Sequence, residues 1–309
     1  MRELAERALR GDRRAIARLI SLAESGSESL KEAMEIIHPR AGRAHVIGVT
    51  GVMGVGKSTL ICEMALKYRE MGKSVGIVAV DPTSPFTGGA LLGDRVRMNP
   101  LASDGEVFIR SMGTRGKLGG LSGAVYDAVE ILDASGKDII IVETVGVGQA
   151  EVDVIRIADT TVVVLVPGLG DFIQTIKAGL MEIADIFVVN KSDRPGADST
   201  VNELKSMMEI SEKMVPVVCT SATEGEGVDE LLVEVENHFQ MLKDTGELER
   251  RRRRRYETEL VEIVMGRLKK MIYDEGRFRE SVGELVRRIT DGELDPHSAA
   301  EEVLAGLLR

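Results

Sequence analysis

Nine consecutive residues, 51–59, have the composition and spacing of a phosphate-binding loop. They read Gly-Val-Met-Gly-Val-Gly-Lys-Ser-Thr and fit the pattern G-x-x-x-x-G-K-[ST]. The glycines let the backbone curl around one anion, and a helix beginning near Lys57 would direct its positive end there. Lys57 would contact the β- and γ-phosphates, and the Ser58 hydroxyl would bind Mg²⁺. The expected nucleotide-binding residues are therefore Gly51, Val52, Met53, Gly54, Val55, Gly56, Lys57, Ser58 and Thr59.

A second pattern, N-K-x-D at residues 190–193, predicts which base is bound. It follows the apolar run 186–189. The Asp193 carboxylate can accept the N1–H and the exocyclic N2–H of guanine, and adenine offers neither donor at those positions. The Lys191 stem would lie along the purine, and Asn190 would tie this loop to the phosphate-binding loop. Guanine is the expected base.

A shorter signal lies after the next apolar run, at Thr220-Ser221-Ala222-Thr223. Backbone N–H groups of such a turn can face guanine O6. A simple turn without a ligand is the alternative, because a dipeptide carries little information by itself. As the third motif in the right order, it adds Ser221, Ala222 and Thr223 to the expected nucleotide contacts.

Three acidic residues near the ends of other apolar runs are candidates for a magnesium shell. Glu143 ends the run 139–142, Asp81 ends the run 75–80, and Asp94 lies in a glycine-rich stretch. Mg²⁺ prefers oxygen ligands, so with Ser58 we expect these three as the metal-side residues. Capping of a turn remains the alternative for Asp81 and Asp94. Gly146, three residues after Glu143, would donate its N–H to the γ-phosphate and so sense the nucleotide state.

Residue 147 is valine, where Ras-like enzymes carry the glutamine that aligns water. Another group must therefore position the water, and slow intrinsic hydrolysis is expected. Gln174 and Lys177 are three residues apart and share a helix face. That face is directed either to the nucleotide or a partner, or to solvent, and the spacing does not choose between them.

The elements that must position these residues alternate between apolar runs and helical segments from about residue 45 to 240. This alternation predicts an α/β fold, a P-loop NTPase with a mostly parallel sheet flanked by helices. The expected strands are 46–50, 74–80, 107–111, 138–143, 161–166, 186–189 and 216–219. In such sheets ligands gather beyond the carboxyl ends of the strands, which is where the polar residues above occur.

Helical patterns flank this region on both sides. We predict an N-terminal helical extension at 1–42, the nucleotide-binding domain at 43–243 and a C-terminal helical module at 244–309. The C-terminal module contains six consecutive arginines, 250–255. An exposed helix face and a specific anion site are both open interpretations of that run.

The composition and charge argue against several classes of protein. The chain has 309 residues and a formal net charge of −10, which argues against a nucleic-acid coat or an anionic-membrane binder. No run approaches ~20 apolar residues, and the N-terminus is charged rather than signal-like, so no membrane association and a cytoplasmic location are expected. Cys62 and Cys219 lie in separate apolar segments and are interpreted as reduced core thiols.

Taken together, these motifs resemble the methylmalonyl-CoA mutase-associated GTPases, the MeaB/ArgK type within the G3E branch of P-loop GTPases. The resemblance spans essentially the whole chain. Its most specific parts are Gly-Gly-Ala-Leu-Leu-Gly-Asp at 88–94 and Glu-Thr-Val-Gly-Val-Gly-Gln at 143–149, with 51–59, 81–85, 167–171 and 190–193 in support.

The resemblance implies an Mg²⁺-dependent GTP hydrolase that acts as a chaperone for an adenosylcobalamin-dependent acyl-CoA mutase. It also implies a homodimer formed through the C-terminal helices, and moving loops that take part in partner-coupled hydrolysis. The residues to which we assign catalytic roles are Lys57, Asp94, Glu143, Gln174 and Lys177. Two alternatives stay open: a G3E-type metal-insertion GTPase, and a P-loop kinase linked to amino-acid transport.

Overall fold

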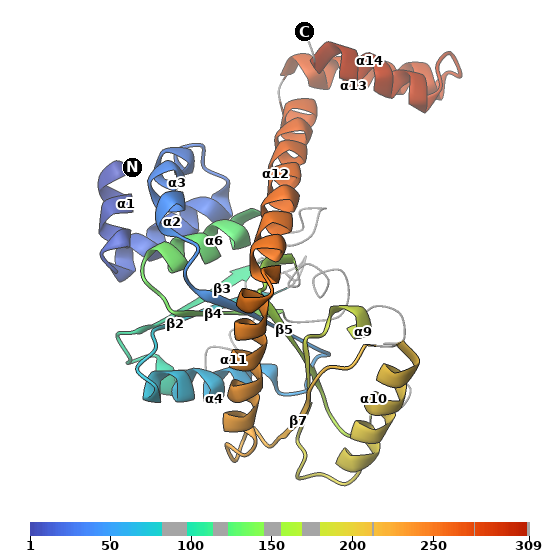
Figure 1. Cartoon of the computed structure of the whole chain (residues 1–309). Coiled ribbons are helices and arrows are strands. Elements are labelled where there is room, and N and C mark those ends of the chain that lie inside the picture. Colours follow the sequence, from blue (N-terminus) through green and yellow to red (C-terminus); the bar gives the residue numbers. More distant parts are fainter. Residues whose placement is uncertain are drawn as a thin grey trace. The chain divides into compact units, whose positions relative to one another are not determined.

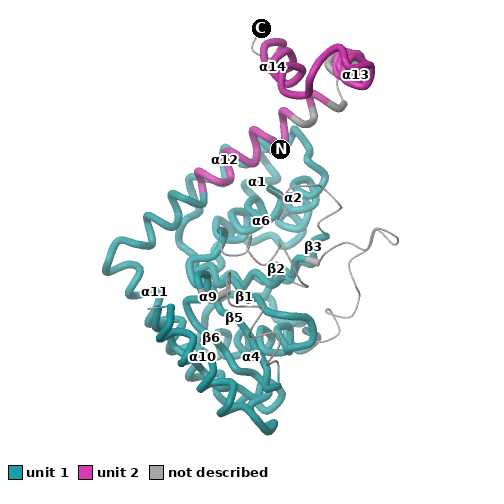
Figure 2. The backbone as a smooth tube through the Cα atoms, turned by 90° about the vertical axis from the view of Figure 1, so that its right-hand side faces the viewer, with its two compact units in different colours: residues 1–255 teal, residues 256–309 magenta. Residues whose placement is uncertain are grey.

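The computed structural model describes residues 1–81, 98–113, 123–144, 156–168, 180–211, 213–274 and 276–307. The chain forms two compact units, residues 1–255 and residues 256–309 (Figure 2). Each unit is described by itself below. Of the residues singled out in the sequence, Asp94, Gly146, Gln174 and Lys177 lie outside the described part, and only the backbone of Asp81 is described.

Among the described residues, seven parallel strands form a sheet at the centre of the first unit, in the order β3-β2-β4-β1-β5-β6-β7. The predicted P-loop α/β architecture is confirmed. The observed strand ends lie within two residues of the expected ones. The strands are β1 (His45–Thr50), β2 (Val75–Asp81), β3 (Val107–Gly113), β4 (Ile139–Thr144), β5 (Thr160–Leu165), β6 (Ile186–Asn190) and β7 (Val217–Thr220).

Helices cover both faces of this sheet (Figure 1). Helices α4 (Lys57–Glu70) and α11 (Val228–Asp244) share a buried core with one face, which includes Ile47, Val49 and Ile141. Helix α6 (Gly123–Ala134) packs on the other face against Ile140 and Val142. The α10 helix (Ala197–Ser211) covers β5 and β6 through Leu204 and Met208. Strands covered on both faces explain the continuous Val/Ile runs of the sequence.

The N-terminal residues form three helices that add to the core over α6. They are α1 (Arg2–Leu9), α2 (Arg13–Ser25) and α3 (Leu30–Ile37), followed by the short 3-10 turn η1 (His38–Arg40). Asp12 caps α2 by accepting from the N–H groups of Arg14 and Ala15, and Gly26 ends it in the left-handed region. The expected helical extension is therefore present. Its end is tied to α6, where Asp133 accepts the backbone N–H groups of residues 42–44 at 2.7–3.1 Å.

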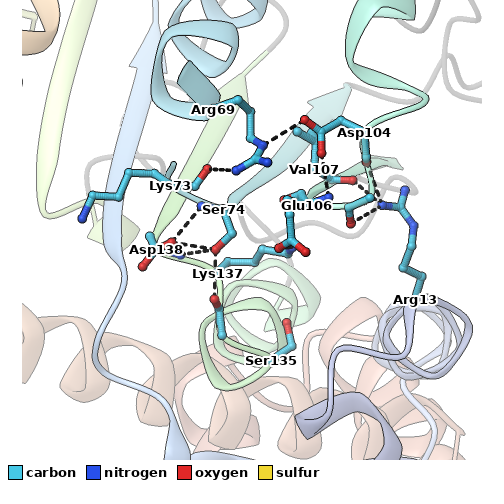
Figure 3. A network of polar contacts seen from close by, with 12 residues as sticks. Arg13, Arg69, Lys73, Ser74, Asp104, Glu106, Val107, Ser135, Lys137 and Asp138 are labelled. Carbon is cyan, nitrogen blue, oxygen red and sulfur yellow. Dashed lines mark hydrogen bonds and ion pairs between the residues drawn. The ribbon is translucent and has the colours of Figure 1, made fainter. Parts of the chain in front are cut away.

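An aspartate stands directly before three of the strands, and each one accepts an N–H from the start of the neighbouring strand. Asp138 accepts from Ser74 at 2.7 Å, Asp159 from Val46 at 3.0 Å and Asp185 from Thr161 at 2.8 Å. Figure 3 shows the first of these contacts, with Ser74 and Asp138 bonded in both directions. These bonds fix the register of the sheet at its amino edge, opposite the predicted nucleotide site.

The remaining described elements are short or C-terminal: η2 (Asn99–Leu101), α9 (Leu180–Ile183), α12 (Glu247–Asp274), α13 (Gly276–Thr290) and α14 (Pro296–Leu307). Helix α12 crosses from the first unit into the second. Within the described residues, every helix is too short or too polar to span a bilayer. Cys62 is buried as expected, but Cys219 is exposed, because β7 is the edge strand of the sheet.

Candidate functional site: the carboxyl edge of the sheet

The loop after β1 curls tightly against the two strands that neighbour it on one side. Gly51 has φ +142°, and a Cβ there would lie 2.2 Å from the Val164 carbonyl oxygen of β5. Gly56 has φ +96°, and a Cβ there would lie 2.5 Å from Asn190 Nδ2. Both positions therefore require glycine, for conformation and for space. The predicted phosphate-binding loop has the geometry that its pattern demands.

Lys57 is buried at the first position of α4, and its ammonium lies inside this loop. Nζ donates to the carbonyl oxygens of Gly51 at 2.6 Å and Val52 at 2.9 Å. The first turn of α4 carries no acidic residue. A buried ammonium, a helix N-terminus and a curled backbone at one place favour a bound anion such as a phosphate chain.

Ser58 and Glu143 meet beside Lys57 although 85 residues separate them in sequence. Ser58 Oγ donates to Glu143 Oε1 at 2.8 Å, and both side chains are buried. β4 lies next to β1 in the sheet, with Val49 opposite Glu143. A hydroxyl and a carboxylate are hard oxygen donors, so this pair fits Mg²⁺. The backbone of Asp81 ends β2, the strand on the far side of β4.

The N-K-x-D motif at 190–193 adjoins the phosphate-binding loop, as the sequence predicted. Asn190 ends β6 and is buried; its Nδ2 donates to the Val55 carbonyl oxygen at 2.8 Å. Its Oδ1 accepts from Thr220 Oγ1 at 3.0 Å and from the Ala222 N–H at 3.1 Å. One side chain thus joins the loops that follow β1, β6 and β7. Thr220 belonged to the motif seen in the sequence, but its hydroxyl was given no role there.

Lys191 and Asp193 lie on the open side of the same loop. Lys191 has φ +57°, and its Nζ donates to the Gly54 carbonyl oxygen at 2.7 Å. Asp193 is exposed, and its Oδ1 accepts from Ser221 Oγ at 3.2 Å. A carboxylate that is held at one oxygen and open to solvent can accept the paired N–H groups of guanine. Thr223 is exposed in the turn after Ala222, and Met53 is exposed at the loop tip.

The arginine run of the sequence lies away from this site and pairs with the aspartates at the amino edge of the sheet. Arg252 Nη2 contacts Asp159 Oδ2 at 2.8 Å, and both Nη atoms of Arg251 contact Asp185 at 2.8 and 2.9 Å. Arg255 donates to the Ile157 carbonyl oxygen at 3.2 Å. Part of the run therefore anchors the first turns of α12, so a purely exposed face was the wrong interpretation for these three residues.

The same edge holds two titratable groups whose pKa values are strongly shifted, Asp185 and His45. Burial raises the pKa of Asp185, but the hydrogen bonds from His238 and Arg251 outweigh it, so the pKa lies well below its ordinary value. Burial lowers the pKa of His45 to about 3. His45 Nε2 contacts Thr160 Oγ1 at 2.8 Å, and its ring stacks on Phe239 at 3.8 Å. Both groups lie at the amino edge of the sheet, opposite the loops that follow the strands.

Comparison with known proteins assigns this site to a family. The family model described as methylmalonyl-CoA mutase-associated GTPase MeaB matches residues 16–276. The chain belongs to the MeaB family of P-loop GTPases. This confirms the family and the hydrolase class that the sequence motifs indicated. The match includes all the loops described above and the whole of α12.

Individual relatives of this MeaB-family chain cover nearly all of it. A Pyrococcus abyssi protein named as a GTPase is 49% identical over 313 residues, which is 99% of this chain and 96% of that protein. The Mus musculus methylmalonic aciduria type A homolog, mitochondrial, is 31% identical over 318 residues, covering 96% and 77%. The solved structure of an LAO/AO transport system kinase has a TM-score of 0.72 and 26% identity, covering 99% and 97%.

Proposed function

We propose that this GTPase binds GTP at the carboxyl edge of the sheet and hydrolyses it with Mg²⁺. The observation that carries the proposal is the Asn190 side chain, which joins the phosphate-binding loop to the two loops that would hold guanine. Asp193 reads the base, and residues 51–59 hold the phosphates. A nucleotide held by all three loops would change their mutual contacts when its γ-phosphate leaves.

The chemistry of hydrolysis is assigned to residues around α4. Lys57 neutralises charge on the β- and γ-phosphates. Ser58 would hold Mg²⁺, and Glu143 and Asp81 would order its surroundings, because the Ser58–Glu143 pair offers the oxygen donors that this ion prefers. When bound, Mg²⁺ supplies positive charge to the phosphate oxygens. For Asp94, Gly146, Gln174 and Lys177 we propose roles in closing the site, by the family resemblance.

We further propose that the GTPase cycle serves an adenosylcobalamin-dependent acyl-CoA mutase. The family description names methylmalonyl-CoA mutase, and a relative named for methylmalonic aciduria matches 96% of this chain. In this proposal the GTP- and GDP-bound forms differ in affinity for the mutase and so gate cofactor loading. A homodimer through the C-terminal helices is part of the proposal.

Titration calorimetry with GTP, GDP and ATP tests the nucleotide assignment on the intact chain. We expect heat from GTP and GDP with Mg²⁺, and weaker binding of ATP. Free phosphate released from GTP distinguishes hydrolysis from a kinase, which would place the phosphate on an acceptor. Lys57→Ala should abolish hydrolysis, and a wild-type rate in that variant would refute the catalytic assignment.

A purified methylmalonyl-CoA mutase tests the partner. The mutase should raise the rate of GTP hydrolysis and bind the GTP and GDP forms with different affinity. Equal binding in both nucleotide states, together with an unchanged hydrolysis rate, would contradict the chaperone role while leaving the GTPase assignment intact.

A further inference from the structure

Two threonines join the strands that carry the phosphate-binding loop and Glu143. Thr50 is the last residue of β1, directly before Gly51, and Thr144 is the last residue of β4, directly after Glu143. Thr144 Oγ1 donates a hydrogen bond to Thr50 Oγ1 at 3.2 Å, and both side chains are 0% exposed. The pair therefore ties together two strand ends at the point where both lead into the site.

The threonines point away from the face of the sheet that holds Ser58. Successive side chains of a strand alternate between faces. Val49 and Ile141 lie in the core shared with α4, and Glu143 reaches Ser58 on that face. Thr50 and Thr144, one residue further along each strand, face the side covered by α6. Their hydrogen bond therefore lies on the face of the sheet opposite the Ser58–Glu143 contact.

We propose that Thr144 is a positioning residue that holds the Glu143 carboxylate in place against Ser58. Glu143 and Thr144 are adjacent on one backbone, so a bond that fixes Thr144 to Thr50 also fixes the distance from Glu143 to the start of α4. Valine has nearly the shape of threonine but cannot donate, and it would leave the buried Thr50 hydroxyl without this donor. The inference rests on the proposed Mg²⁺-dependent GTPase function.

The test compares the Mg²⁺ requirement of GTP hydrolysis in Thr144→Val, Thr144→Ser and wild type. In Thr144→Val the Mg²⁺ concentration for half-maximal rate should rise by roughly three- to tenfold, the range expected for one lost hydrogen bond. Thr144→Ser keeps the hydroxyl and should behave as wild type. GDP affinity measured in EDTA should stay within about twofold in all three proteins, because the guanine loops are untouched.

Thr161→Val is the matched control, since Thr161 is a buried threonine at the amino edge of β5. The inference would be overturned if the Mg²⁺ concentration for half-maximal rate rose equally in Thr161→Val, or did not rise in Thr144→Val. Where Thr144→Val does not fold, Thr50→Val removes the acceptor of the same bond and should give the same rise. In the double variant the two effects should not multiply, because one bond is lost in each case.

The outcomes separate this inference from the function on which it rests. A wild-type chain without Mg²⁺-dependent GTP hydrolysis would overturn both. Active wild type with an unchanged Mg²⁺ requirement in Thr144→Val and Thr50→Val would overturn only the role of the threonine pair.

Discussion

At the scale of single residues, Asn190 and Asp193 of the N-K-x-D motif differ in burial and in the hydrogen bonds that they make. Asn190 is buried and makes its three hydrogen bonds within the protein, so it sets where the loop lies before a nucleotide arrives. Asp193 is exposed and only lightly held by Ser221 at 3.2 Å. Asn190 therefore holds the loops together, and the exposed Asp193 is the residue to which we propose to assign recognition of the base.

Replacing Asp193 with asparagine should relax the preference for GTP over ATP. An amide oxygen accepts more weakly than a carboxylate, and the new NH₂ group meets the N–H donors of guanine. A loss of about 1–3 kcal/mol in guanine binding corresponds to a fall of roughly five- to 150-fold in the GTP:ATP affinity ratio. Calorimetric titration of both nucleotides measures this ratio.

The control for this change is Asp198→Asn, an exposed aspartate in the first turn of α10. It removes the same charge from a position only five residues further along the chain, outside the motif at 190–193. A GTP:ATP ratio in Asp193→Asn that matches this control would argue against base recognition by Asp193.

At the scale of elements, two of the three aspartates before the strands bind both a neighbouring strand and helix α12. Asp159 caps β1 through Val46 and also receives Arg252 of α12; Asp185 caps β5 through Thr161 and receives Arg251. Each carboxylate therefore links sheet register to the position of α12. In the sequence the arginine run could be interpreted as one exposed charged face. In the structure, Arg251 and Arg252 each bind a different aspartate.

Arg252→Ala should destabilise the first unit by about 3 kcal/mol, since Asp159 is 1% exposed and would keep a buried charge with its main counterion removed. Urea denaturation followed by circular dichroism measures the change. Arg250→Ala is the matched control, because the Arg250 side chain is 67% exposed and should contribute within about 0.5 kcal/mol. Equal loss in both variants would contradict a specific anchor at Asp159.

His45 should make the free energy of unfolding depend on pH. Its pKa is about 3 in the fold and near 6.5 when unfolded, so between these values only the unfolded chain binds the proton. Above pH 6.5 the imidazole is neutral in both states and does not affect the free energy of unfolding. As the pH falls below 6.5, protonation of the unfolded chain lowers the free energy of unfolding by at most about 1.4 kcal/mol per pH unit. His45→Gln should remove that slope between pH 7 and pH 5.

The contribution of His45 to the pH dependence of unfolding is obtained only from the difference between wild type and variant. Burial raises the pKa of Asp127 to about 7, so this carboxyl acts in the opposite direction and favours the fold as the pH falls. Urea denaturation at several pH values should therefore compare wild type, His45→Gln and the exposed-site control His297→Gln. A slope that is the same in wild type and His45→Gln would refute the buried neutral imidazole.

At the scale of the whole molecule, exposed apolar residues gather on the part of α12 that belongs to the second unit. Leu260, Val261 and Val264 are 63%, 60% and 46% exposed. Leu260 and Val264 are one turn apart and share a face. Apolar faces of this kind mark protein–protein contacts, which supports the proposed homodimer through the C-terminal helices.

Analytical ultracentrifugation should give twice the 33.6 kDa mass of one chain for wild type. The double variant Leu260→Glu/Val264→Glu should sediment as a monomer, because four charges in two copies would have to be desolvated at the contact. Ile210→Glu is the control, since Ile210 is 85% exposed on α10 in the first unit. A dimer that survives the double variant and is lost in the control would exclude this surface.

The sequence alone determined the signals that are local. The phosphate-binding loop is nine consecutive residues, the guanine motif is four, and strand and helix periodicity are set by neighbours along the chain. These patterns were sufficient to predict the parallel sheet, the flanking helices and the loops that meet at its carboxyl edge. The family resemblance rested on equally contiguous strings.

Only the tertiary structure decided the long-range pairs that no motif of the sequence indicated. Thr144 and Thr50 are 94 positions apart, and Arg252 and Asp159 are 93 apart. Such pairs depend on strand order and register, which no local periodicity encodes. The sheet brings β4, β1, β5 and β6 side by side. This packing places Arg252 against Asp159 and lets Thr144 at the end of β4 donate a hydrogen bond to Thr50 at the end of β1.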